Sequence, residues 1–90
     1  MMHKQILKGR VVLVKAMGGI PRVRRLWDLG KRVAYVCSEE QYRRLHSGLL
    51  AASPIGFPKG DVYIVAAQDA ARYERDGKAE WDQLPSLANQ

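Results

Sequence analysis

Glycine and proline divide this chain into short segments. The stretches "MGGIP" (17–21) and "PIGFPKG" (54–60) each combine at least two glycines with proline. Glycine reaches positive φ and proline fixes φ near −65°, so both stretches predict turns. The helices and strands must therefore lie in the segments before, between and after these two turns. Ninety residues, 47% of them apolar, predict one globular domain with a modest core.

The segment before the first turn is predicted to form a strand, and the segment after it can be interpreted in two ways. A β-branched run within 10–16 predicts a strand. Residues 20–37, "IPRVRRLWDLGKRVAYVC", can form a hairpin with a tight turn at 28–31. In the other interpretation Pro21 begins a helix and Gly30 ends it. The arm "RVAYVC" carries apolar residues on both faces, which favours a central strand with Tyr35 in the core.

A short helix is predicted over 38–48. Ser38 is a suitable N-cap, Gln41 stands at the capping-box position, and Gly48 is a suitable stop. Residues 49–61 predict a loop and 62–67 a strand. The charge then changes sign. Residues 1–68 hold twelve basic and four acidic residues, a net +8, whereas residues 69–90 hold three and five, a net −2. We therefore divide the chain into a basic globular domain (1–68) and a mildly acidic, partly ordered tail (69–90).

The segment Gly56-Phe57-Pro58-Lys59-Gly60-Asp61-Val62 resembles the closing motif of SH3-like β-barrels. In those folds a glycine and a hydrophobic residue precede a proline, one turn of 3₁₀ helix follows, and the last strand begins at a valine. The resemblance implies an α+β protein, a small SH3-like β-barrel with the helix at 38–48 inserted between strands. The alternative is a small α/β fold in which strands (10–16, 31–37, 61–67) alternate with helices (21–29, 38–48).

The formal net charge of +6 favours a polyanionic partner, either DNA or RNA, or an acidic protein. A domain of this size has little stability to spare for a deep catalytic cavity, so we expect a binding module and not an enzyme. The leading hypothesis is non-catalytic binding of nucleic acid with low sequence specificity. The alternative is a protein-interaction module, or a small accessory or inhibitor protein, that docks on an acidic partner.

The candidate contacts are the basic residues around the predicted hairpin and on the predicted helix. In the hairpin the arginines and Lys31 gather near one end of a two-stranded ribbon, where they can follow a phosphate backbone. Trp27 is the candidate platform for a stacked base, although a tryptophan between leucines is more often a core residue. The proposed phosphate contacts are Arg22, Arg24, Arg25, Lys31, Arg32, Arg43 and Arg44.

Other chemistries have little support in the sequence. The lone cysteine, Cys37, has no internal disulfide partner, and no Cys/His pattern at metal-ligand spacing predicts a metal site. "AMGGIP" lacks the lysine of a phosphate-binding P-loop, so we expect no cofactor. We assign no catalytic residue, because Cys37 and His46 have no third orienting group. No long apolar run is present, so we expect no membrane association and a cytoplasmic location.

Overall fold

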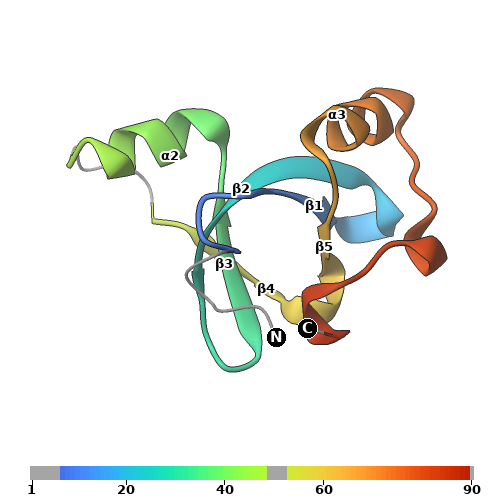
Figure 1. Cartoon of the computed structure of the whole chain (residues 1–90), viewed down its shortest axis with the longest axis horizontal. Coiled ribbons are helices and arrows are strands. Elements are labelled where there is room, and N and C mark those ends of the chain that lie inside the picture. Colours follow the sequence, from blue (N-terminus) through green and yellow to red (C-terminus); the bar gives the residue numbers. More distant parts are fainter. Residues whose placement is uncertain (1–6, 49–52, 90) are drawn as a thin grey trace.

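The computed structural model describes residues 7–48 and 53–89, and its strands form one antiparallel sheet (Figure 1). The strand order is β4-β3-β2-β1-β5. Two α-helices and four 3₁₀ turns, η1 to η4, join or follow the strands in the described residues. The elements are β1 (Val11–Lys15), η1 (Met17–Gly19), β2 (Pro21–Leu29), β3 (Val33–Cys37), α2 (Glu39–His46), β4 (Ile55–Pro58), η2 (Lys59–Asp61), β5 (Val62–Ile64), α3 (Ala67–Asp76), η3 (Trp81–Gln83) and η4 (Leu87–Asn89).

The hairpin interpretation of residues 20–37 is confirmed, although its turn lies at 30–32 and not at the predicted 28–31, because Asp28 and Leu29 still pair with β3. The alternative α/β architecture with a helix at 21–29 is wrong. β2 pairs antiparallel with β1 from Pro21 to Arg25 and with β3 from Arg25 to Leu29. The strand satisfies the backbone of both neighbours, which a helix at the same place would leave unpaired. A register shift between Leu26 and Asp28 places a β-bulge at Trp27.

The predicted helix is confirmed as α2, together with its cap. The Gln41 amide donates to Ser38 Oγ at 3.1 Å, and the Ser38 amide donates to Gln41 Oε1 at 3.0 Å. This reciprocal pair satisfies two of the donors that a helix N-terminus leaves without intrahelical partners. Gly48 follows the helix with φ +82°, which fits its predicted role as a stop.

The predicted loop at 49–61 contains a strand, so that prediction is wrong for residues 55–58. β4 pairs with β3 from Ile55 to Pro58. The proline and glycine content of β4 led to the loop prediction, because proline is tolerated only at edge or terminal strand positions and glycine weakens strand propensity. The 3₁₀ turn η2 and the start of the last strand at Val62 occur where the sequence placed them, but the strand predicted over 62–67 ends at Ile64, and Ala67 begins α3. Residues 49–52 of the predicted loop lie outside the described residues.

The sheet is strongly curled. Only the three residues of η2 separate Pro58 at the end of β4 from Val62 at the start of β5, so their Cα atoms lie within about 14 Å of each other. A flat sheet would hold these two edge strands about 19 Å apart, since neighbouring strands are spaced by about 4.8 Å. Phe57 of β4 and Val62 of β5 accordingly pack in one cluster. Figure 1 shows the curved course of the strands.

Two apolar clusters stabilise the fold, one on each face of β1. The inner cluster contains Val12, Val14, Leu26, Val36 and Val62 among its buried residues. The outer cluster lies between the sheet and α3 and contains Leu13, Tyr63, Val65 and Ala70. The prediction that Tyr35 is a core residue is wrong. It is 40% exposed, because it lies on the outer face of β3 opposite Gly56 of the edge strand.

The C-terminal residues pack against both faces of the sheet. α3 contacts β1 and β2, Trp81 packs on Tyr63 with ring centroids 4.8 Å apart, and buried Leu87 belongs to the inner cluster. The Ile64 amide donates to the Pro85 carbonyl at 2.9 Å, which covers the outer edge of β5. The predicted boundary after residue 68 falls inside α3. No helix among the described residues combines the length and apolarity needed to cross a membrane.

Candidate nucleic-acid interface

Three cations from two separate segments meet at the turn of the β2–β3 hairpin. Lys31 and Arg32 form the turn, and the backbone amide of Lys59 in η2 donates to the Arg32 carbonyl at 3.1 Å. A cavity of about 440 Å³ opens between the turn, η2 and η4. We call it the basic hollow, and its lining residues are Lys31, Arg32, Pro58, Lys59, Gly60, Leu87 and Ala88.

The basic hollow is uniformly positive. Within the described part of the chain, no carboxylate lines it and none of its three cations belongs to an ion pair. The charges of Lys31, Arg32 and Lys59 are therefore available to an anion. The sequence pointed to the first two but missed Lys59, which lies 27 positions further along the chain. Only the pairing of β3 with β4 brings it to the turn.

Arg22 and Arg24 lie at the other end of β2, and the predicted gathering with Lys31 and Arg32 does not occur. Arg22 pairs with Val14 and Arg24 with Val12, near the start of the strand. Lys31 lies nine positions after Arg22, which corresponds to about 30 Å of extended chain. The strand has nearly the predicted length, but Arg22 and Arg24 stand seven and five positions before its end at Leu29, too far from the turn to join Lys31 and Arg32.

Arg25 is engaged within the fold. Its Nε donates to Glu39 Oε1 at 3.0 Å, and its Nη1 donates to the Gly9 carbonyl. The guanidinium carbon lies 4.9 Å from the ring centroid of Tyr42, a distance typical of a cation–π contact. These three contacts join the turn before β1, strand β2 and helix α2.

Arg43 and Arg44 are exposed on α2, which follows the end of β3 remote from the hairpin turn (Figure 1). Arg44 pairs with Glu40 one helical turn earlier, at 2.7 Å. Both residues are therefore separated from the basic hollow by the length of β3.

Trp27 is half-buried at the bulge of β2, where it contributes to a second cavity. Its ring meets the Tyr42 ring edge to face, with centroids 6.0 Å apart. Tyr42 stacks on His46, one turn further along α2, at 5.6 Å. The cavity measures about 410 Å³, and we call it the aromatic hollow. Its lining residues are Lys8, Gly9, Trp27, Asp28, Tyr42 and His46.

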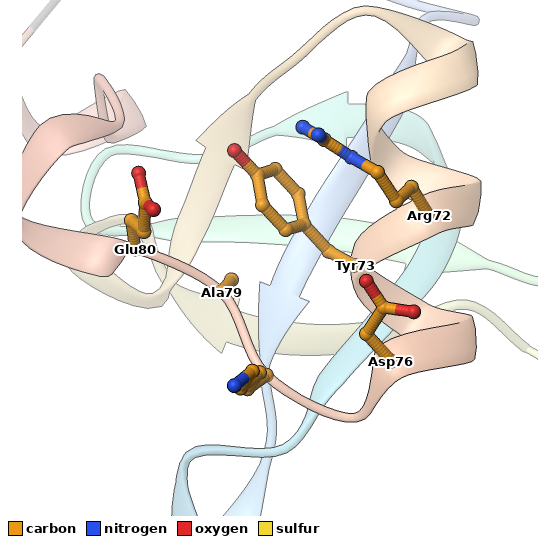
Figure 2. Close-up of a pocket in the computed structure, with 6 residues that line it drawn as sticks. Arg72, Tyr73, Asp76, Ala79 and Glu80 are labelled. Carbon is orange, nitrogen blue, oxygen red and sulfur yellow. The ribbon is translucent and has the colours of Figure 1, made fainter.

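A third cavity, of about 390 Å³, lies beside the end of α3 (Figure 2). Figure 2 shows the Tyr73 ring between Arg72 and Glu80, and the Arg72 guanidinium lies 4.9 Å from that ring. Two cations and two carboxylates line the cavity, so its charges balance and it offers little attraction to a polyanion. The charged lining residues are Arg72, Asp76, Lys78 and Glu80.

Cys37 is buried at the end of β3, with 2% of its surface exposed. Burial raises the pKa of its thiol, the nearby Glu39 carboxylate raises this pKa further, and Arg25 acts in the opposite direction. The thiol faces the Arg25 carbonyl, with Sγ 3.9 Å from the oxygen. It therefore remains protonated at neutral pH, and a protonated thiol is a weak nucleophile.

Within residues 7–48 and 53–89, no three His, Cys, Asp or Glu side chains are grouped as a metal site would require. Comparisons with protein-family models, curated proteins and solved structures found no match to this chain.

Proposed function

We propose that this protein is a non-catalytic nucleic-acid-binding domain whose basic hollow holds the phosphate backbone. The observation that carries the proposal is the meeting of Lys31, Arg32 and Lys59 around a cavity that no carboxylate of the described residues lines. Arg32 offers a planar fork that can hold two phosphate oxygens, and the lysines add compact charges. Phosphates carry no base identity, so contacts of this kind give affinity with little sequence preference.

We also propose that the curled sheet is a small SH3-like barrel. The strand order, the 3₁₀ turn between β4 and β5, and the pairing of β5 with β1 support this interpretation. α2 is then an insertion between β3 and β4. In such a barrel the hairpin turn and η2 lie at the same end, which is how two segments of the chain can supply one cation cluster.

The test is a salt titration of binding to DNA and RNA with Lys31→Gln, Arg32→Gln and Lys59→Gln combined. Each lost phosphate contact lowers the slope of log K against log salt by about 0.7–0.9, so the triple variant should lose about 2–3 from the slope. Arg75→Gln is the matched control, because Arg75 is exposed on α3 and lies outside the hollow. Absence of binding to any nucleic acid at about 50 mM salt would refute the proposal.

One observation favours docking on an acidic protein as the second candidate function. Ile55 of the edge strand β4 is 62% exposed, and the same strand ends at Pro58 in the wall of the basic hollow. Protein interfaces combine charge with an apolar centre, whereas phosphate contacts need no isoleucine. Ile55→Ser should weaken the capture of an acidic protein partner and leave nucleic-acid affinity unchanged.

A further inference from the structure

The aromatic hollow has the construction of a ligand site. The Arg25 guanidinium lies against one ring, Tyr42, and is itself fixed by Glu39 and the Gly9 carbonyl. Tyr42 in turn contacts Trp27 and His46. Three rings from two elements are thus held together beside an open cavity instead of being sealed in the core.

Two backbone features form this cavity. The bulge at Trp27 breaks the alternation of β2, and bulges characteristically redirect a side chain. Gly9, at φ +86°, lets the chain pass the Tyr42 hydroxyl, since a Cβ there would lie 2.7 Å from that oxygen. A larger residue at position 9 would be strained and would displace the tyrosine.

The charges around the rings limit the class of ligand. Arg25 already lies against Tyr42, and Lys8 stands at the rim, where it pairs with Asp28 at 3.1 Å. Arg25 is also paired with Glu39, so the charges beside the rings are balanced. The Tyr42 ring already holds a cation, which disfavours a cationic guest such as a methylated lysine. The open rings favour a planar neutral guest, which is the chemistry of a nucleobase.

We propose that the aromatic hollow binds an unstacked base of single-stranded nucleic acid, with Trp27 as the stacking platform. This inference rests on the proposed function and adds a preference for single strands. In a duplex each base is covered on both faces by its neighbours, so a base could stack on Trp27 only after leaving the duplex stack. A flexible strand presents its bases at a much lower cost.

The experiment uses anisotropy with labelled single strands of about 12 nucleotides and a duplex of the same sequence, on the full chain. Trp27→Ala should weaken single-strand binding roughly 5- to 140-fold and change duplex binding little. Trp27→Phe keeps a ring and should retain most of the affinity. Tyr35→Ala is the matched control, since Tyr35 is an exposed aromatic outside the hollow.

A second measurement follows Trp27 directly. Trp81→Phe leaves Trp27 as the sole tryptophan, and its fluorescence should be quenched by a single strand and not by the duplex. Trp81 donates Nε1–H to the Gly19 carbonyl at 3.1 Å, so this variant is first checked for a cooperative unfolding transition. If it does not fold, iodide quenching of the unsubstituted protein, compared with Trp27→Phe, gives the Trp27 signal.

The outcomes separate this inference from the proposed function. Equal affinity for single strand and duplex, with Trp27→Ala unchanged, would refute the stacking site while leaving the salt-dependent binding intact. A mononucleotide that binds the hollow as tightly as the oligonucleotide would also overturn the single-strand proposal. Unchanged affinity and an unchanged salt slope in the variant that combines Lys31→Gln, Arg32→Gln and Lys59→Gln, with Trp27 quenching preserved, would instead refute the basic hollow.

Discussion

Arginines of similar sequence context have different roles in this protein. Arg25 connects β2 to α2 through a carboxylate, a carbonyl and a ring, with only 30% of its side chain exposed. Arg32, seven residues later, is exposed and forms no ion pair in the described part of the chain. A role in binding phosphate suits an arginine such as Arg32, because its charge is not already neutralised by a carboxylate of the protein.

Arg25→Gln should therefore reduce stability and leave the salt slope of binding unchanged. The substitution removes a charged hydrogen bond and the cation–π contact, with an expected loss of about 1–2 kcal/mol in the free energy of unfolding. Urea denaturation measures the loss, and Arg32→Gln is the control that should change the salt slope with little effect on stability. If Arg25→Gln instead reduces the slope of log K against log salt and leaves stability unchanged, Arg25 contacts phosphate as the sequence predicted.

Among the elements, the first half of strand β2 has no neighbouring strand on the side where β3 pairs with its second half. β3 pairs with β2 only from Arg25 onward, so residues 21–24 present a free edge. Glu74 of α3 accepts the Val23 amide at 2.9 Å, and Arg24 Nη1 donates to the Val23 carbonyl at 2.7 Å. Pro21 has no amide to satisfy. Side chains thus occupy an edge that could otherwise pair with another strand.

Glu74→Ala is expected to expose this edge. The Val23 amide loses a charged acceptor, which should cost about 1–2 kcal/mol of unfolding free energy and increase hydrogen exchange at Val23. Glu74→Gln retains an acceptor at the same place and should restore most of the protection. If amide exchange at Val23 is the same in Glu74→Ala and the parent protein, the edge is protected by something other than this contact.

The elements that the sequence predicted well are those determined by local chemistry. The capping box at Ser38, the β-branched run of β1 and the turn around Pro58 need only neighbouring residues. β4 was missed because its strand character comes from pairing with β3, and Lys59 was missed because the same pairing brings it to the hairpin turn. The aromatic hollow depends on a bulge at Trp27 and a glycine at position 9, neither of which local propensity reveals.

For the whole molecule, the change in net charge after residue 68 does not coincide with a boundary in the packing of the fold. The acidic region after residue 68 supplies Ala70 to the outer cluster, Leu87 to the inner cluster, and Leu87 with Ala88 to the wall of the basic hollow. Removing residues 69–90 changes the net charge from +6 to +8 and also removes these contacts. An effect of truncation on binding would therefore mix electrostatics with unfolding.

Glu80→Gln with Asp82→Asn separates the two effects, because it gives the same net charge of +8 by changing two exposed residues. The double variant should unfold cooperatively and bind nucleic acid more tightly at about 50 mM salt, with the gain shrinking as screening increases. The truncated chain should show no cooperative transition in urea, since Leu13 and Tyr63 lose their cover. A truncated chain that unfolds cooperatively and binds like the double variant would mean that residues 69–90 contribute charge and little else to this fold.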